Sequence, residues 1–355
     1  MKLVNTRINT PTGQVAVGVG VGVGALVAWW AWRRSTANQL PTKWEEVGVV
    51  SKLNVYPLKS GRPVSVSEAD ATERGLSADG ALDRSFLVMK KDGPLLTGRQ
   101  VPKLTRVAIS FKGHKVTFES PDNPAGPIEV DLELVAKEAK VVELIVFGAN
   151  AKGLDCGDEV AAWMSQAVSA GETPVRLLYN GEDPLTQRCA RRAPYYDFRH
   201  IRDSDKVTYA DTCAYMLASE SSLVDLNARL AEPVTIDWFR ANVVVQGSAA
   251  YDEDDWAFVR FGGEGEQSVV LRRLKPCDRC IFTTVDPYRG CKTADQEPMT
   301  TLRKYRLLDG PEKLAKAWSI KPVFGSHMGI DVCGKVKVGD KVWVARASSN
   351  PRWHF

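Results

Sequence analysis

The chain has 355 residues, of which 44% are hydrophobic and 25% charged, so it can bury the cores of one or two globular domains. A net charge of +4 is too small to predict nucleic-acid binding, which requires a strongly basic face. Seven cysteines at wide, irregular spacing argue against the disulfide framework of a small secreted domain, and four separated histidines form no zinc motif.

Residues 1–34 are predicted to form an N-terminal membrane anchor. Within them, residues 15–32 carry no charged side chain, and a helix of this length spans roughly 27 Å, close to the hydrocarbon thickness of a bilayer. Trp29, Trp30 and Trp32 crowd its end and two arginines follow, as at a membrane interface. The Val-Gly alternation has the period of a strand, but a lone strand in lipid leaves its backbone groups unsatisfied. A cleaved signal peptide is the alternative.

Residues 35–47 form a polar linker, and the region after it is predicted to be rich in strands. Apolar runs bounded by turn residues predict strands over residues 48–57, 86–89, 95–97, 114–120 and 141–148. Asp92-Gly93 is expected to turn the second of these into the third as a hairpin. Val160, Trp163 and Met164 recur at helical spacing and predict a helix over residues 156–168.

The second half of the chain continues with strands and a few helices. Residues 181–206 are rich in charge and aromatics without periodicity, which predicts a long loop of the kind that often carries function. Ser219 fits the N-cap of a helix over residues 219–230. The remaining predictions are strands over residues 207–212, 242–247, 268–274 and 279–285, a helix over 299–306, and a hairpin over 335–345 that turns at Gly339-Asp340. Because strands and helices do not alternate regularly, we expect a β-rich α+β fold with a barrel, not a doubly wound parallel sheet.

Cys277 and Cys280 are the closest pair of cysteines in the chain. A structural zinc site would need a second pair at similar spacing, which the sequence lacks, and a thioredoxin-type pair would stand between a strand and a helix. Arg279 lies next to Cys280, and an adjacent cation favours the thiolate that binds metal or attacks an electrophile. The residues alone leave two roles open, a reactive or metal-binding thiolate and a buried structural cysteine.

The segment "RCIFTTVDPYRG" at residues 279–290 resembles the signature of the MOSC-domain family, in which one such cysteine is the thiolate ligand of a molybdenum cofactor. Further segments occur in the order seen in the mitochondrial amidoxime-reducing components, which are MOSC-domain molybdenum enzymes. They are "VYPLKS" at 55–60, "DRSFLV" at 83–88, "TGRQ" at 97–100, "DCGDEVAAW" at 155–163, "YADT" at 209–212, "SLVDLNARL" at 222–230, "FRAN" at 239–242 and "KPVFGSHMGI" at 321–330. The resemblance implies a transmembrane helix, then a β-rich MOSC N-terminal domain over 48–178 and a MOSC β-barrel domain over 179–349.

The resemblance also implies which residues bind the cofactor. Its phosphate and pterin would be held by the residues that match the family's motif: Lys59, Ser60, Arg84, Asp211, Thr212, Arg240, Asn242 and Arg279. Cys280 would be the metal ligand, since a soft thiolate suits molybdenum alongside the two cofactor sulfurs. Cys277 receives no metal role. Asp278 departs from the family pattern and, on position alone, is a candidate proton donor and catalytic residue.

A basic segment within the predicted loop has several possible roles. It contains Arg188, Arg191, Arg192, Arg199 and Arg202. These arginines could be solvated, could cover the cofactor, or could bind an acidic redox partner. Tyr195 and Tyr196 of the same segment could line a substrate entrance.

The resemblance implies a reductase that removes oxygen from amidoximes, hydroxylamines and N-oxides. No nicotinamide fingerprint follows a predicted strand, so the family's electron donors, cytochrome b5 and NADH-cytochrome b5 reductase, are the implied partners. The implied location is the mitochondrial outer membrane, single-pass, with the catalytic domain facing the cytosol. Two alternatives remain: a non-catalytic molybdenum cofactor or sulfur carrier, and a β-rich membrane protein that binds no metal.

Overall fold

The computed structural model describes residues 40–181, 185–190, 200–263, 268–308 and 321–348. The chain divides into two units, Met1–Lys43 and Trp44–Phe355, and all elements below belong to the second. Among the described residues, no helix is both long enough and apolar enough to cross a membrane. The predicted anchor at residues 15–32 lies outside the described residues.

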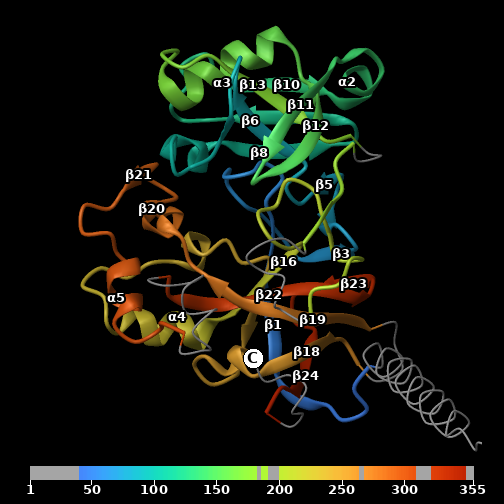
Figure 1. Ribbon diagram of the computed structural model, residues 1–355, viewed down its shortest axis with the longest axis vertical. Coiled ribbons are helices and arrows are strands. Elements are labelled where there is room, and N and C mark those ends of the chain that lie inside the picture. Colours follow the sequence, from blue (N-terminus) through green and yellow to red (C-terminus); the bar gives the residue numbers. More distant parts are fainter. Residues whose placement is uncertain (1–39, 182–184, 191–199, 264–267, 309–320, 349–355) are drawn as a thin grey trace, which may run out of the picture. The chain divides into compact units, whose positions relative to one another are not determined.

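Seven strands close into a barrel, which confirms the expectation of a β-rich fold with a barrel (Figure 1). Their order is β17–β16–β22–β19–β18–β24–β1, and β17 pairs back onto β1. The strands are β1 (Glu45–Val55), β16 (Tyr215–Ser219), β17 (Val243–Gln246), β18 (Trp256–Phe261), β19 (Val269–Asp278), β22 (Val323–Val332) and β24 (Lys341–Arg346). Within this barrel only β16 and β17 pair in parallel, and α4 (Glu220–Asn227) follows β16 on the way to β17. Ser219 caps α4, because its hydroxyl accepts from the Ser222 amide at 3.2 Å, as the sequence predicted.

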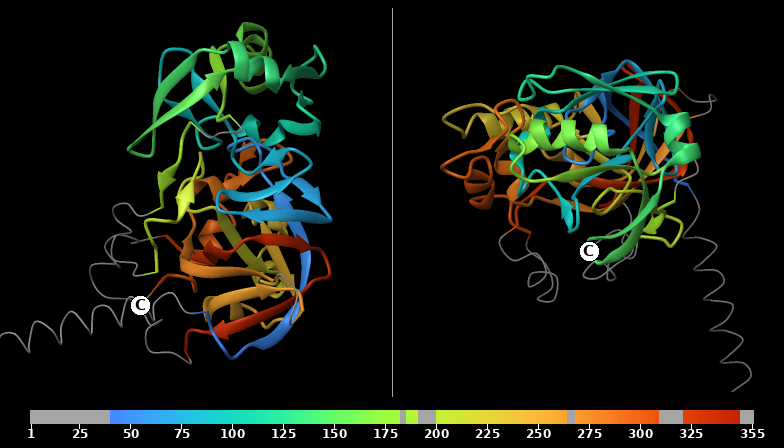
Figure 2. Two further views of the ribbon diagram at one scale, coloured as in Figure 1. Left: turned by 90° about the vertical axis from the view of Figure 1, so that its right-hand side faces the viewer. Right: turned by 90° about the horizontal axis from the view of Figure 1, so that it is seen from above.

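The barrel is held together by apolar side chains from all seven strands. Fully or almost fully buried members are Leu53, Leu217, Val243, Val259, Leu271, Met328 and Val344. The strand at the start of the second unit and the last strand of the described chain lie side by side, since β1 pairs with β24 (Figure 2). Burial of the barrel interior therefore depends on segments almost 300 residues apart in sequence.

A second β-rich region lies between β1 and β16 in the chain. A five-stranded sheet has the order β11–β12–β13–β6–β7, and a three-stranded sheet has the order β10–β9–β8. The strands are β6 (Phe86–Lys90), β7 (Leu95–Leu96), β8 (Ala108–Lys112), β9 (Lys115–Glu119), β10 (Ile128–Asp131), β11 (Val141–Val146), β12 (Ala149–Asp155) and β13 (Val175–Tyr179). The predicted helix is confirmed as α3 (Asp158–Ser169), which buries Val160, Trp163 and Met164 against this region. The predicted hairpin at Asp92-Gly93 is confirmed by the pairing of β6 with β7.

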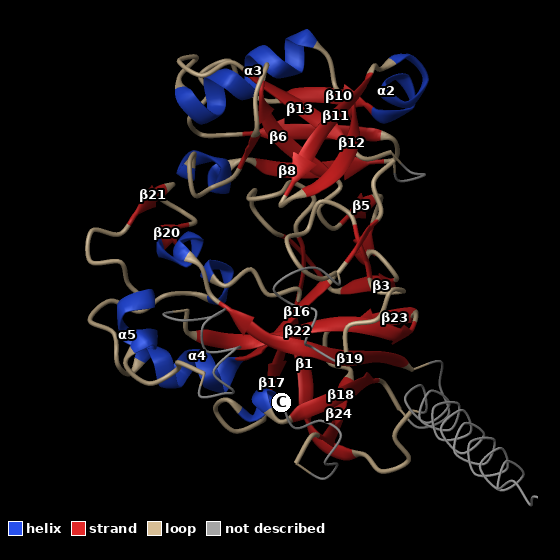
Figure 3. Ribbon diagram, viewed as in Figure 1, coloured by secondary structure: helices blue, strands red, loops and turns tan. Residues whose placement is uncertain are grey.

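The remaining elements are short (Figure 3). A four-stranded sheet contains β23 (Gly334–Lys337), β3 (Glu68–Thr72), β4 (Gly75–Ala78) and β5 (Ala81–Leu82), and β2 (Val64–Val66) pairs with β1. Two small pairs are β14 (Arg188–Cys189) with β15 (Lys206–Val207), and β20 (Val285–Asp286) with β21 (Cys291–Lys292). The short helices are η1 (Pro102–Arg106), α2 (Leu132–Glu138), η3 (Ile236–Trp238), η4 (Asp252–Asp254), η5 (Ile281–Thr284) and α5 (Met299–Arg303).

Three local predictions were wrong. The strand predicted over residues 279–285 is instead the 3₁₀ helix η5 followed by the two residues of β20. The strand predicted over residues 207–212 ends at Val207. The segment around Gly339-Asp340 does turn, but it forms no hairpin, because β23 pairs with β3 while β24 pairs with β1 and β18.

Candidate functional site

Three of the predicted cofactor-binding residues have an uncommon backbone conformation. Ser60 has a φ of 71°, Arg84 of 51° and Arg240 of 58°. Residues with a Cβ seldom adopt this left-handed region, and such strained positions cluster at functional sites. Ser60 follows β1, Arg84 precedes β6, and Arg240 lies between η3 and β17. Two of these positions therefore lie in segments next to barrel strands, β1 and β17, and the third lies next to β6 of the second β-rich region.

Lys59 and Arg99 share one carboxylate and one aromatic ring. The buried Lys59 Nζ donates to the Tyr209 carbonyl at 2.8 Å and also to Asp211, and Arg99 Nη2 donates to Asp211 Oδ2 at 3.0 Å. Both cations lie over the Phe147 ring, at 4.8 Å and 5.2 Å from its centroid. Burial lowers the pKa of Lys59 to about 8, although Asp211 opposes this shift. Arg99 had no predicted role, although its segment "TGRQ" was part of the resemblance.

Arg84 and Arg240 share the Tyr56 ring. Their guanidinium carbons lie 4.7 Å and 4.2 Å from its centroid. Arg84 donates to the buried Asp83 carboxylate, and Arg240 Nη1 donates to the Gly61 carbonyl at 2.6 Å. Removal from water, and then the neighbouring Arg84, lower the pKa of Arg240 to about 10. A cavity of about 140 Å³ adjoins Arg240 and Gly61.

These two groups together carry more positive than negative charge. The cation cluster, as we call it, comprises Lys59, Arg84, Arg99 and Arg240, and the carboxylates within it are Asp83 and Asp211. Two of its nitrogens, Arg240 Nη2 and Arg99 Nε, are buried without a hydrogen-bond partner among the described residues. Buried donors are rarely left unpaired in native proteins. An anion such as a phosphate would both pair them and balance the charge, so the residues fit the anionic end of a pterin cofactor.

Asn242 does not fit the predicted role of cofactor contact, because both ends of its side-chain amide are already hydrogen-bonded to protein groups. Its Nδ2 donates to Asp83 Oδ1 at 2.9 Å and to the Asn54 carbonyl at 3.2 Å. Its Oδ1 accepts from the Met216 amide at 3.1 Å and from Arg84 Nη1 at 3.4 Å. Asn242 therefore orients Asp83 and Arg84.

Cys280 occupies the N-cap position of η5, immediately after β19 and Arg279. Its thiol is free and partly exposed, and its carbonyl accepts from the Thr283 amide at 2.9 Å. This placement leaves its sulfur available as a soft metal ligand. Cys277 is buried and accepts a hydrogen bond from Arg279 Nη1 at 2.9 Å. Thr212 is also buried, next to Asp211 in the loop before β16.

Asp278 does not fit the role of proton donor. Its Oδ1 pairs with the fully buried Lys275, and its Oδ2 lies 3.5 Å from Lys321 Nζ. Burial raises the pKa of Asp278, but the charges around it, chiefly the hydrogen-bonded Lys275, together lower it to about 2. The carboxyl group therefore carries no proton near neutral pH, and it serves instead to neutralise a buried ammonium.

Two arginines of the basic segment point into the protein. Arg188 is buried and donates to the carbonyls of Thr208 and Val146, at 2.9 Å and 3.3 Å, and also to that of Ala210. Arg202 pairs with Asp331 at 3.0 Å. Arg188 is thus a buried structural residue, whereas Arg202 is partly exposed. The others, Arg191, Arg192 and Arg199, lie outside the described residues together with Tyr195 and Tyr196.

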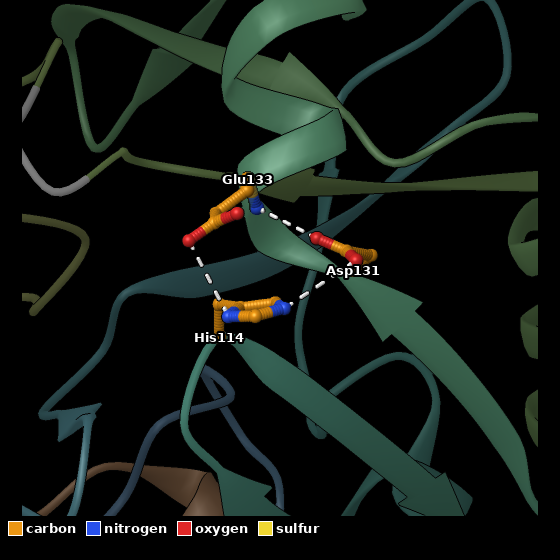
Figure 4. Close-up of side chains that lie close together, drawn as sticks. All are labelled: His114, Asp131 and Glu133. Carbon is orange, nitrogen blue, oxygen red and sulfur yellow. Dashed lines mark hydrogen bonds and ion pairs between the residues drawn. The ribbon is translucent and has the colours of Figure 1, made fainter.

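A second cluster of possible metal ligands lies on the surface, far in sequence from Cys280 (Figure 4). His114 Nε2 lies 3.6 Å from Asp131 Oδ2, and His114 Nδ1 lies 3.4 Å from Glu133 Oε1. The other Asp131 oxygen caps α2 by accepting from the Glu133 and Leu134 amides. The three side chains are largely exposed, and exposed acidic groups commonly gather in this way without a metal, so we assign the cluster no role.

The closed barrel, the second β-rich region, the cation cluster and the free cysteine at the start of η5 are features of a MOSC-domain protein. The family model described as "MOSC N-terminal beta barrel domain" matches residues 47–171, and the model described as "MOSC domain" matches residues 204–343. The chain belongs to the mitochondrial amidoxime-reducing component family. This membership supports a function related to the molybdenum cofactor.

Three relatives illustrate the similarity. The rat "Mitochondrial amidoxime reducing component 2" is 34% identical over 335 residues, which cover 94% of this chain and 93% of the rat protein. "Mitochondrial amidoxime-reducing component 1" of Danio rerio is 36% identical over 301 residues, or 85% of this chain and 86% of that protein. The human component 2 is 34% identical over 317 residues, or 88% of each chain.

Proposed function

We propose that this protein uses a molybdenum cofactor to reduce N-hydroxylated compounds, namely amidoximes, hydroxylamines and N-oxides. The observation that carries the proposal is the cation cluster, in which two buried arginine nitrogens have no partner in the part of the chain that the structure describes, together with the free thiol of Cys280. An anionic cofactor with a soft metal would match both features. Relatives over nearly the whole chain are named for the reduction of amidoximes, which favours this substrate class.

The protein's part in such a reaction is to hold and orient the cofactor. The cation cluster would bind its phosphate, and Cys280 Sγ would be the metal's protein ligand. Asn242 keeps Arg84 and Asp83 in place, and Asp211 keeps Lys59 and Arg99 together. When bound, the cofactor supplies the two-electron chemistry that removes the oxygen from nitrogen.

Electrons would come from cytochrome b5 and NADH-cytochrome b5 reductase. We propose that residues 15–32 anchor the protein in the mitochondrial outer membrane as a single span, with the catalytic part facing the cytosol. The apolar sequence of these residues and the word "mitochondrial" in the names of the relatives support this location.

The test begins with the full chain expressed in a host that makes the cofactor. Molybdenum is measured by mass spectrometry, and benzamidoxime reduction is followed with a chemical reductant and with cytochrome b5 and its reductase. Wild-type protein should contain about one molybdenum per chain and turn over with both electron sources. A folded preparation without molybdenum would refute the proposal, and a fully loaded but inactive one would favour a cofactor or sulfur carrier.

Cys280→Ser tests the metal ligand. It should lower turnover at least about a hundredfold while the thermal unfolding curve stays close to that of the wild type, because the side chain is small and partly exposed. Cys291→Ser is the matched control, since Cys291 is a free, exposed cysteine outside the site, and it should leave turnover unchanged. Near-normal turnover in Cys280→Ser would remove Cys280 from the mechanism.

A further inference from the structure

We propose that Arg279 is a positioning residue that locks the turn bearing Cys280 to the segment bearing Arg240. The inference rests on the proposed function. Arg279 was predicted to contact the cofactor. We assign it instead the role of holding other residues of the site in position.

The Arg279 side chain is buried and joins three segments. Its Nη1 donates to Cys277 Sγ at 2.9 Å, its Nη2 to the Phe239 carbonyl at 2.9 Å, and its Nε to Thr283 Oγ1 at 3.3 Å. Its backbone amide donates to the Pro322 carbonyl at 2.8 Å. One guanidinium thus ties the end of β19 to η5 and to the connection between η3 and β17.

The segments joined by Arg279 carry the two ends of the proposed cofactor site. Cys280 is the next residue in the chain, and Phe239 is the residue before Arg240. The guanidinium also lies over the Phe239 ring, 5.3 Å from its centroid, and Phe239 stacks on Phe324 at 3.9 Å. These contacts hold Phe239 in place and therefore fix the backbone position of the next residue, Arg240. Because Arg279 makes them, it also fixes the position of Cys280 relative to Arg240.

Only arginine can make this set of contacts. Each acceptor is bound by a different nitrogen of the side chain, which matches the fixed fork of a guanidinium. A lysine ammonium could reach one or two of them but could not span all three. The spacing of the Cys-x-Arg-Cys motif follows from this geometry, since the first cysteine is an acceptor for the arginine and the second is the ligand.

The test compares Arg279→Lys with the wild-type holoenzyme. The variant keeps the positive charge but loses the forked guanidinium, so we expect it to fold. We expect it to release molybdenum about tenfold faster during gel filtration and to show a broadened Mo(V) electron paramagnetic resonance signal. Tenfold is the change expected when a charge-assisted hydrogen bond is lost. Arg273→Lys is the matched control, because Arg273 is a buried arginine of β19, the strand that ends just before Arg279, and does not take part in the Arg279 contacts. Its spectrum should equal that of the wild type.

A double-mutant cycle separates positioning from general destabilisation. If Arg279 acts through Arg240, the release rates of Arg279→Lys and Arg240→Ala should combine less than multiplicatively. Multiplicative rates, or an unchanged spectrum and release rate in folded Arg279→Lys, would overturn the inference.

Cys277→Ala serves if Arg279→Lys does not fold. It removes only one acceptor, so release should accelerate about threefold with the same spectral broadening. Wild-type release and spectrum in folded Cys277→Ala would then overturn the inference. Wild-type protein that lacks molybdenum or activity would count against the proposed function and not specifically against the positioning role of Arg279.

Discussion

Replacing Arg240 with methionine should separate the stability of the fold from the retention of the cofactor. Methionine keeps much of the aliphatic length of arginine but removes the charge and the unpaired Nη2. In the cofactor-free protein, Arg240 is a partly buried cation beside a second cation, Arg84. In the loaded protein, the same charge would face the cofactor phosphate.

The structure gives the sizes of the opposing effects in the cofactor-free state. A pKa lowered to about 10 corresponds to roughly 3 kcal/mol of unfavourable interaction for charged Arg240. The variant loses this penalty, but it also loses the hydrogen bond to Gly61, about 1 kcal/mol, and the contact with the Tyr56 ring, about 1 kcal/mol. The free energy of unfolding should therefore change by no more than about 1 kcal/mol. The loaded protein loses a charge-assisted contact of about 1.5–3 kcal/mol, or roughly 10- to 150-fold in cofactor affinity.

The assay measures thermal unfolding of both forms and molybdenum retained after extended dialysis. Arg260→Met is the matched control, because Arg260 is a barrel arginine that also lies over aromatic rings, those of Trp44 and Trp343, outside the cation cluster. The control should shift both forms equally and retain molybdenum. A loss of several kcal/mol by the cofactor-free Arg240→Met protein, with retention equal to the control, would show that Arg240 is purely structural.

Three further predictions concern neighbouring features. Burial raises the pKa of Glu253 to about 7, so the folded state holds this proton more tightly than the unfolded chain does. The free energy of unfolding should therefore fall by about 3 kcal/mol as the pH rises from 4.5 to 7. Glu253→Gln should remove this pH dependence when unfolding is measured across the same range. Asp278→Asn should destabilise by about 3–5 kcal/mol in denaturant unfolding, because Lys275 loses its buried counter-charge; an unchanged midpoint would contradict this reasoning. Gly98→Ala should lower the melting temperature and molybdenum content together, since its Cβ would lie 2.2 Å from the Phe282 ring next to the Cys280 turn.

Local patterns predicted the fold well where the pattern itself decides the structure. The periodicity of Val160, Trp163 and Met164 corresponds to the buried face of α3, and Ser219 accepts the hydrogen bond of an N-cap. The segment around Gly339-Asp340 also turns as expected. What the pattern cannot give is the partner of each strand, and β23 and β24 leave that turn for different sheets. Strand pairing is decided by tertiary packing, which local sequence does not encode.

The same distinction holds for the candidate site, where the sequence points to residues but not to the contacts of their side chains. Resemblance to the family singled out Lys59, Arg84 and Arg240 as cofactor-binding residues, and the structure brings all three into one cation cluster. It could not give the direction of a side chain. Asn242 and Arg279 point to protein acceptors and donors, which is a property of the packed structure. Arg99 was missed because its partner, Asp211, is 112 residues away.

The cation cluster contains residues from both of the regions that the family models match. Lys59, Arg84 and Arg99 lie within residues 47–171, whereas Arg240 and Asp211 lie within residues 204–343. Like charges brought together in this way oppose folding until an anion binds between them, because each cation raises the free energy of the charged form of its neighbour. A ligand that binds only the folded state then stabilises it by mass action. The cofactor phosphate would therefore act as a structural link between the two regions as well as an anchor for the metal.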